Sequence, residues 1–426
     1  MSVEPRRYIT SRFDWEKCFF FSSIINSLDD KYPACLFTMP LLLSCALFAY
    51  LYITSSIFFD ILHYFFHQWS TSQWKALQWL SQCHRYHHLY YNRALKFNSR
   101  FQLQNNWIAL PLEMICLIIG GLLGWFCLQL LTAKVANCTV LIIVLAVHFI
   151  RTLVVIWMNG RDSNHIEHST VPKDPHWLFV GPQFHAMHHV DPDHYMSSVV
   201  KMFDWVAGTA YTLQNKNVAI TGGSGAFGSA IRRQLQAEGV KNIYMLKFGT
   251  HWTHHDFSHI GPALDNADIL ILAHGTKGED AMDSNCNSTT RLTQLFMERK
   301  IRQEGCRNTM PEVWYIGSEI ELHPAFGIPD MQRYSASKRA FLPYARALYD
   351  HPKIIYRHIV PAAFDSPMGK AIASPEWAAR VVMWWVRRGA RYVPATYTGI
   401  AYLNFVKFIA WVRPEADGVD GLNKAN

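Results

Sequence analysis

Long apolar runs separated by short polar connections fill much of the first half of the chain. The segment from Pro33 to Trp69 holds Asp60 as its one acidic residue, and further apolar segments run from Trp107 to Leu131 and from Val135 to Met158. About 20 helical residues cross a bilayer, so each segment is long enough to span it. We therefore expect an α-helical integral-membrane region whose first helix extends beyond the bilayer.

The pattern changes near Leu213 to Lys216 to short apolar runs separated by helical segments. NIYMLKF, ADILILAHG and EVWYIGS read as strands, which predicts βαβ units and an α/β Rossmann-like domain. From Thr398 to Arg413 the chain is again apolar but too short to span a bilayer comfortably, which indicates an interfacial helix or, alternatively, a segment that covers a substrate. We expect domains at residues 1–213, 214–395 and 396–426.

Ten histidines lie in four short groups among the apolar segments, with the spacings HxxxH, HxxHH, NHxxH and HxxHH. They are His63, His67, His84, His87, His88, His165, His168, His185, His188 and His189. Residues four apart on a helix share a face. Neutral imidazole is a common metal ligand, and ten imidazoles exceed the roughly four to six positions around one ion. The groups therefore predict two metal ions without distinguishing iron from zinc, copper or nickel.

Acidic and amide side chains stand beside these groups. Asp60 precedes His63 by about one turn, and Asn164, Glu167 and Asp191 accompany the later histidines. Such groups hold the second ring nitrogen of a ligating histidine. We expect them to orient the imidazoles, with ordinary helix polarity as the alternative for Asp60 and Glu167.

The histidine pattern over residues 35–205 resembles the fatty acid hydroxylase and sterol desaturase superfamily, including the Asn164 that precedes the third pair. The resemblance implies two non-haem iron ions bound by the ten histidines. It further implies that dioxygen is activated to attack an unactivated C–H bond of a lipid substrate, with electrons from an external donor.

In the second domain, TGGSGAFG follows a strand and opens a helix. Glycines at these positions let the backbone approach a pyrophosphate at the helix N-terminus. Tyr334 and Lys338, in YSASK, are four residues apart and so share a helix face. An ammonium group near a phenol favours the phenolate, so we expect Lys338 to lower the pKa of Tyr334.

In this order and spacing the second domain resembles the short-chain dehydrogenase/reductase family over residues 216–370. The resemblance implies that Tyr334 is the acid/base, Lys338 orients the ribose, Ser318 holds the substrate oxygen and Asn285 completes a proton relay. It places NADP or NAD over the following residues: Gly222, Ser224, Gly225, Gly228, Lys247, Ala273 and Gly275. Lys247 stands where an acid would bind a ribose 2′-hydroxyl, which favours NADP.

The second domain also departs from the family pattern. AHG replaces the usual NAG, and Ala362 follows Pro361 where a glycine is usual. The interval between the glycine loop and Ala273 is short, which indicates that one strand–helix unit is lost. In that interval HWTHHDFSH imitates the HxxHH spacing without partner groups, and we interpret it as a solvated loop.

Composition and charge fit a membrane half joined to a soluble half, since 50% of the 426 residues are hydrophobic and 17% are charged. The formal net charge of +8 is spread along the chain, which favours a membrane surface over nucleic acid as partner. Basic residues between 70 and 106 should lie on the cytoplasmic side. We therefore expect a multi-pass protein with the histidine groups and the dehydrogenase domain on that side.

The orientation of the N-terminus stays open. A single first span places it outside, whereas Arg6, Arg7 and Arg12 favour the inside, and a re-entrant segment around Pro40 would reconcile the two.

The whole arrangement resembles bacterial fusions of a sterol desaturase with a short-chain dehydrogenase. We expect a hydroxylase of a fatty acyl, sterol or isoprenoid lipid, whose product alcohol the second domain interconverts with a carbonyl. Desaturation or aldehyde-to-alkane conversion at the same metals is one alternative. A non-catalytic lipid- or metal-binding partner is the other.

Overall fold

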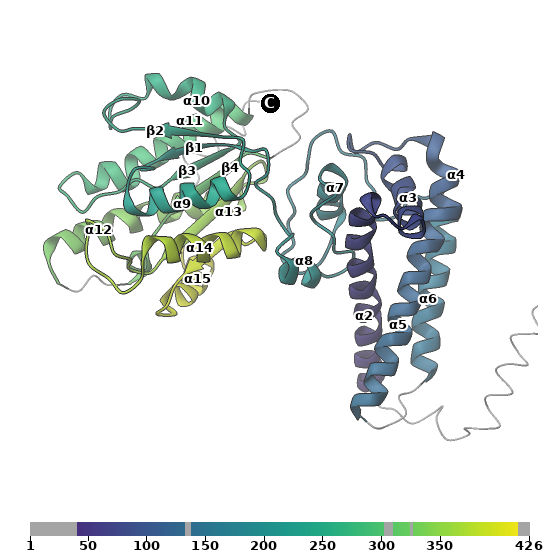
Figure 1. Cartoon of the computed structure of the whole chain (residues 1–426). Coiled ribbons are helices and arrows are strands. Elements are labelled where there is room, and N and C mark those ends of the chain that lie inside the picture. The colour runs from purple at the N-terminus through teal and green to yellow at the C-terminus, as the bar shows by residue number, and fades with distance from the viewer. Residues whose placement is uncertain (1–40, 133–137, 302–309, 324–326, 416–426) are drawn as a thin grey trace, which may run out of the picture.

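The computed structural model describes residues 41–132, 138–301, 310–323 and 327–415. Figure 1 shows two units side by side, a bundle of long helices with a cap of short helices and loops, and a sheet flanked by helices. The expected fold class is confirmed: a helical, histidine-bearing unit precedes a Rossmann-like unit. The expectations for Pro40 and the N-terminal arginines lie outside the described residues.

The helical unit contains three stretches that are long and apolar enough to cross a membrane: Leu41–Thr71, Ser99–Thr132 and Cys138–Trp157. These match the three apolar segments expected from the sequence. The elements of this unit are α2 (Leu41–Gln68), η2 (Trp69–Thr71), α3 (Lys75–Tyr90), η3 (Ser99–Phe101), α4 (Gln102–Gln104), η4 (Asn105–Ala109), α5 (Leu110–Thr132), α6 (Cys138–Trp157), α7 (Pro182–Val190) and α8 (Met202–Ala207).

Helices α2 and α5 pack closely because α5 presents glycines to α2. A Cβ atom at Gly120 would lie 2.7 Å from Phe58 Cβ, and one at Gly124 would lie 2.3 Å from Thr54 Oγ1. Small residues four apart allow this close approach of helices in a lipid environment. The contact holds the C-terminal part of α2, which carries His63 and His67, beside the start of α5.

The second unit is a six-stranded parallel sheet with the order β2-β1-β3-β4-β5-β6. Its elements are β1 (Asn217–Thr221), α9 (Ala226–Ala237), β2 (Asn242–Leu246), η5 (Ser258–Ile260), α10 (Gly261–Asn266), β3 (Ile269–Leu272), η6 (Asp283–Asn287), α11 (Ser288–Ile301), β4 (Glu312–Ile316), η7 (Glu319–Leu322), α12 (Pro329–Ala340), α13 (Leu342–Asp350), β5 (Ile355–Pro361), α14 (Pro375–Arg387), β6 (Tyr392–Ala395) and α15 (Ile400–Ala410).

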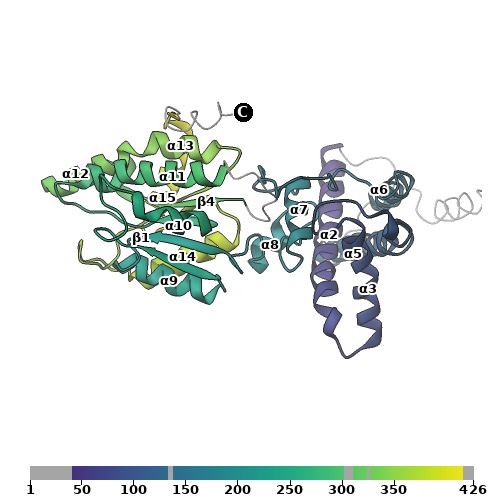
Figure 2. The ribbon, with the colours of Figure 1, turned by 90° about the horizontal axis from the view of Figure 1, so that it is seen from above.

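Both faces of the sheet are covered, which explains why its strands are continuously apolar. Helices α9 and α14 cover one face, and α11 and α13 cover the other (Figure 2). Doubly wound sheets often have the order 3-2-1-4-5-6, so the strand that would lie outside β2 is missing here. This agrees with the short interval read from the sequence. Trp252 from that interval is buried and donates to Leu246 O, so the loop is not wholly solvated.

The helical unit joins the sheet at the edge where the strands begin. Tyr211 and Lys216, which precede β1, both bond Glu312 at the start of β4, at 2.5 and 2.9 Å. Lys173 donates to the His351 carbonyl, just before β5, at 2.6 Å. The carboxyl ends of the strands, where Rossmann-like units bind ligands, therefore point away from the junction.

Candidate metal centre and dinucleotide site

Nine of the ten predicted histidines converge into two groups. In each group one side-chain nitrogen per residue lies within 4.8 Å of the others. The first group is His63, His67, His84, His88 and His188, and the second is His87, His165, His185 and His189. Neighbouring histidines on α3 and α7 belong to different groups, so these two helices lie between the two candidate metal positions.

The spacing of the nitrogens fits a metal ion in each group. Adjacent Nε2 atoms are 3.0–3.3 Å apart in the first group and 2.9–3.2 Å apart in the second. Imidazole nitrogens bound about 2.1 Å from one ion lie roughly 3 Å from each other.

The tautomers of these histidines also fit a bound metal ion. His63 Nδ1 lies 3.0 Å from Met196 O and His188 Nδ1 lies 2.8 Å from His194 O. A carbonyl oxygen only accepts, so each Nδ1 carries the proton and each Nε2 offers a lone pair to the group. Several lone pairs that meet at one point repel one another unless a cation lies between them, so the donor set fits a metal ion.

Electrostatics keep these imidazoles in the form that binds metal. Burial, reinforced by neighbouring imidazoles, holds the pKa values of His84, His88 and His188 well below the usual range. Burial likewise lowers the pKa of His87 to about 3. Metal ligation requires neutral histidine, so the site is ready for a cation at neutral pH.

His168 is the one predicted ligand that the structure leaves out of both groups. Its backbone amide bonds the Leu95 carbonyl at 3.4 Å, which fixes it beside the loop after α3, and its buried Nε2 has no hydrogen-bond partner. The pair NHxxH therefore contributes His165 alone to the candidate ligands.

The expected orienting residues also need correction. Asp60 accepts from the Ser198 amide at 2.9 Å, so it fixes the loop whose Met196 carbonyl holds His63. Glu167 pairs with Lys96 on the surface, and Asp191 pairs with His194. The backbone N–H of Asn164 donates to the Asp162 carboxylate.

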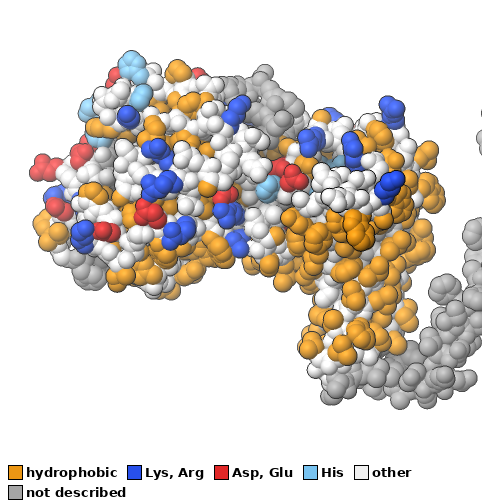
Figure 3. Space-filling view, viewed as in Figure 1, with side chains coloured by type: hydrophobic (Ala, Val, Ile, Leu, Met, Phe, Trp, Pro, Cys, Tyr) orange, Lys and Arg blue, Asp and Glu red, His pale blue; other side chains and the backbone are white. Residues whose placement is uncertain are grey.

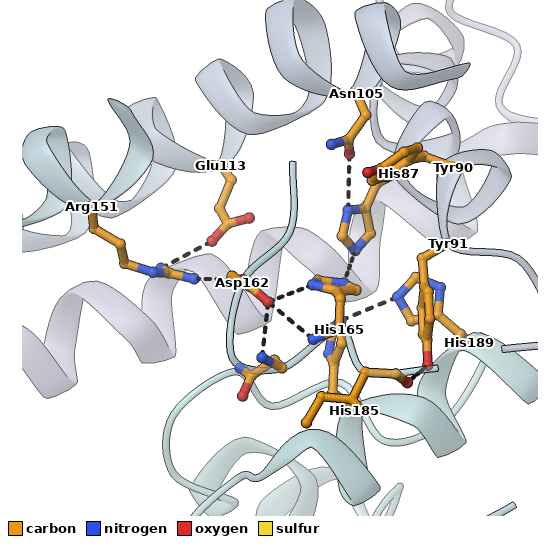
Figure 4. Close-up of polar contacts among 12 residues, drawn as sticks. His87, Tyr90, Tyr91, Asn105, Glu113, Arg151, Asp162, His165, His185 and His189 are labelled. Carbon is orange, nitrogen blue, oxygen red and sulfur yellow. Dashed lines mark hydrogen bonds and ion pairs between the residues drawn. The ribbon is translucent and has the colours of Figure 1, made fainter. Parts of the chain in front are cut away.

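Asp162 is the orienting residue that the sequence reasoning missed. Its carboxylate lies 2.6 Å from His165 Nδ1 and 3.5 Å from the guanidinium of Arg151, which also bonds Glu113 at 3.2 Å (Figure 4). Burial favours the neutral acid, but His165 and Arg151 outweigh it and lower the pKa of Asp162. The signal was available, because charges such as Glu113 and Arg151 within apolar helices mark functional positions.

Beside the second group, Asn105 Oδ1 lies 3.3 Å from His87 Nδ1 (Figure 4). Between the imidazoles and the apolar helices lies a cavity of about 30 Å³, space for roughly two water-sized molecules. Phe59, Phe66 and Leu112 line its apolar side, and Glu113 and Arg151 its charged side. The metal positions thus face the helices that fit a lipid environment.

The glycine loop has the geometry of a phosphate cradle. Gly222 has a φ of 63°, and a Cβ atom at Gly228 would lie 2.1 Å from Gly222 O, so α9 starts directly against the loop. Helix α9 has Gly225 as its N-cap and no side-chain cap, which leaves its first amides for an anion. Exposed Ser224 lies in this loop, and exposed Lys247 follows β2. The residues present fit a dinucleotide.

The predicted catalytic residues meet at the carboxyl ends of β3 and β4. Asn285 Oδ1 accepts from the Thr276 amide at 3.1 Å, and a Cβ atom at Gly275 would lie 2.6 Å from this oxygen and 3.7 Å from Lys338 Nζ. Lys338 Nζ donates to Ile316 O at 2.8 Å and lies 5.8 Å from the centre of the Tyr334 ring. Ser318 follows β4 and its side chain hydrogen-bonds Tyr334.

The expectation that Lys338 lowers the pKa of Tyr334 is not met in the structure. Burial raises the pKa of Tyr334 to about 12, although its hydrogen bond with Ser318 opposes this. Burial also lowers the pKa of Lys338 to about 8. Burial therefore dominates the pKa of both groups.

Two further residues of this unit were not foreseen from the sequence, the buried Glu321 and the half-buried His274. Glu321 accepts from the Ser318 amide at 3.2 Å and contacts His358 Nε2 at 2.7 Å. His274, the residue that replaces the usual asparagine of NAG, contacts Thr221 Oγ1 at 2.7 Å and Ser288 Oγ at 3.2 Å. His274 thus ties β1 and β3 to α11 with side-chain hydrogen bonds.

No protein-family model matches the chain. The monoglucosyldiacylglycerol epimerase of Synechocystis sp. is 27% identical over 256 residues, a match that covers 54% of this chain and 61% of that protein. The chain thus matches less than two thirds of that relative's length.

Among solved structures, a short-chain dehydrogenase from Burkholderia cenocepacia in complex with NADP is 16% identical, with a TM-score of 0.36, and the match covers 47% of this chain and 95% of that one. A short-chain dehydrogenase from Sphingobium yanoikuyae in complex with NADPH is also 16% identical, with a TM-score of 0.37 and coverages of 45% and 92%.

By its own residues, the chain joins two units. The converging histidines of the helical unit resemble the pattern of the fatty acid hydroxylase and sterol desaturase superfamily, and the Rossmann-like unit carries a glycine loop and an Asn–Ser–Tyr–Lys set that resemble those of the short-chain dehydrogenase/reductase family.

Proposed function

We propose that this protein is a membrane enzyme that oxidises a lipid at a pair of metal ions and interconverts an alcohol with a carbonyl in an NAD(P)-dependent second unit. The observation that carries the proposal is the convergence of two sets of imidazole nitrogens next to apolar helices. We propose a multi-pass protein with both sites on the cytoplasmic side, which the basic residues between 70 and 106 support.

Two iron ions, the metals of the family that the histidine pattern resembles, would supply dioxygen activation, with electrons from an external donor. The chain's own residues hold the ions and limit access of water. The Phe59, Phe66 and Leu112 side of the cavity favours a hydrocarbon over water, so these residues would help to exclude water from the bound metals. Asp162 and the Met196 and His194 carbonyls keep the ligand nitrogens pointed inward.

In the second unit, NADP or NAD would supply hydride transfer. Tyr334 gives or takes the hydroxyl proton of the substrate, Ser318 holds the substrate oxygen, and Lys338 binds the ribose hydroxyls. Asn285 passes the proton onward. Covalent linkage raises the local concentration of one unit around the product of the other, which supports consecutive reactions on one lipid.

The similarity to a protein named monoglucosyldiacylglycerol epimerase favours a second candidate. A dehydrogenase site inverts a carbinol if the hydroxyl is first oxidised to a carbonyl and then reduced from the other face. NAD(P) would take the hydride from the carbinol and return it to the other face, while Tyr334 would take the hydroxyl proton and return it, so such a reaction has no net redox change. The substrate class would be a glycosylated lipid.

One experiment separates these candidates. Protein reconstituted with iron, candidate lipids, NADP(H) and a chemical reductant is followed by dioxygen uptake and mass spectrometry of the lipid. Hydroxylation adds the mass of one oxygen atom, desaturation removes two hydrogens, and epimerisation changes neither the mass nor the dioxygen level. Protein that retains no iron and consumes no dioxygen with any lipid would remove the oxygenase proposal.

A further inference from the structure

Helix α15 presents an apolar surface where a helix on a soluble domain would be polar. Its inner face consists of Ala401, Asn404 and Phe408, and Asn404 Nδ2 donates to Glu319 O at 2.8 Å, so the helix is fixed to the sheet unit. The outward side chains are apolar: Tyr402, Leu403, Phe405, Val406, Ile409 and Trp411. Leu403, Val406 and Trp411 are 60, 62 and 72% exposed, so this surface lacks a partner within the described residues.

A second apolar surface lies on α8 and on the segment before α7, which holds Trp177. Val206 is 83% exposed, and Trp177, which stacks on Trp205 at 5.6 Å, is 76% exposed. Figure 3 shows apolar side chains along the lower margin of the sheet unit, where Figure 1 places α15, and onward past α8 to the long helices. We call the exposed apolar residues of α8, Trp177 and α15 the seating surface.

The position of α8 along α2 locates this surface relative to a bilayer. Ser198, in the loop before α8, contacts Ser56 Oγ at 3.1 Å and donates its amide to Asp60 at 2.9 Å. Asp60 lies about 29 Å along the helix from Leu41, and the hydrocarbon core is about 30 Å thick. Helix α8 therefore lies at the level where α2 would leave the hydrocarbon.

Basic and aromatic side chains border the same margin. The Arg388 guanidinium lies 3.7 Å from the centre of the Trp384 ring, and Lys407 Nζ lies 6.0 Å from that of Trp411. Tryptophan with adjacent cations is typical of the membrane–water interface.

We propose that the seating surface binds the surface of the same bilayer that the long helices cross, so that the sheet unit lies on the membrane rather than projecting into water. One bilayer can contact the long helices, α8 and α15 together, because their apolar surfaces lie on one side of the molecule. The placement does not depend on the reaction proposed above.

The test uses the full chain in nanodiscs of phosphatidylcholine and phosphatidylglycerol that contain a phospholipid with a photoreactive diazirine near the glycerol. After irradiation, mass spectrometry locates lipid adducts. We expect adducts on peptides of α8 and α15 as well as the long helices, and none on α10, on the opposite margin of the sheet unit in Figure 1.

The variant Val406→Asp should lower the adducts on α15 at least threefold without changing those on α5. Leu103→Asp is the matched control, because Leu103 is 70% exposed on α4, at the end of the helical unit away from Leu41, and it should leave α15 adducts unchanged. Adducts confined to the long helices would overturn the proposal. So would chemical cross-links between the α15 helices of two copies, which would assign the surface to a dimer.

Discussion

The two units hold their ligands in opposite ways. The helical unit assembles its candidate metal positions from side chains on α2, α3, α7 and the loop around His165, which are far apart in sequence. The Rossmann-like unit builds its phosphate cradle from the backbone of one loop and one helix. A site made of converging lone pairs needs its cation to offset their repulsion, whereas a backbone cradle is complete before its ligand arrives.

The largest effect is expected from removing one imidazole of each group. His188→Ala should empty the first position and His165→Ala the second, so each should lower bound iron from about two ions per chain to about one. Lipid oxidation should be lost in both. Metal analysis of detergent-purified protein measures this, with His255→Ala, an exposed histidine outside both groups, as the control. Two ions retained in both variants would contradict the assignment.

The converse test acts on the Rossmann-like unit. Tyr334→Phe removes the group that moves the substrate proton, so nucleotide-dependent turnover should fall by about 10²- to 10⁴-fold. The affinity for NADPH, measured by fluorescence titration, and the iron content should stay unchanged. Loss of iron in this variant would show that the two units are not independent.

Orientation of a ligand should matter less than the ligand itself. Asp162→Asn weakens the hold on His165 Nδ1, and iron affinity at the second position should fall by about 10- to 100-fold. Chelator competition measures this affinity. Asp191→Asn, whose pair is His194, serves as the control and should have no effect.

Burial of Lys338 predicts a pH dependence of stability. Its pKa of about 8 in the folded protein lies below the ordinary 10.5, so the unfolded chain binds more protons between these values. Stability of the cofactor-free unit should therefore rise between about pH 8 and 10, by up to about 3 kcal/mol in free energy of unfolding. Denaturant unfolding of wild type and Lys338→Met measures this; a rise that persists in the variant would assign it to another group.

The smallest effect is expected at His168. Because this side chain joins neither histidine group, His168→Ala should keep about two iron ions per chain, in contrast to His165→Ala. Metal analysis of both variants side by side shows whether His168 is a metal ligand, as the sequence pattern predicts, or lies outside both groups, as in the structure.

Local spacing accounts for what the sequence predicted well. The i,i+4 pair His84 and His88 shares a group because one helix turn separates them, and the glycine loop lies between a strand and a helix as its pattern required. The distribution of imidazoles between two positions was not predictable, because it depends on how α7 packs against α3. The contact of Asp162 with His165 three residues later is local and was within reach of the sequence, whereas its ion pair with Arg151 depends on the packing of α6.

The junction between the helical unit and the sheet has a kinetic consequence. Because α8 and its neighbours meet the beginnings of the strands, at Glu312 and His351, a sheet about 15 Å or more deep separates them from the nicotinamide pocket. Among the described residues, the sheet therefore stands between the histidine groups and the carboxyl ends of the strands. If a lipid visits both, it travels by lateral diffusion in the leaflet, and an unlabelled alcohol added to the vesicle should dilute an isotopically labelled intermediate before its second turnover.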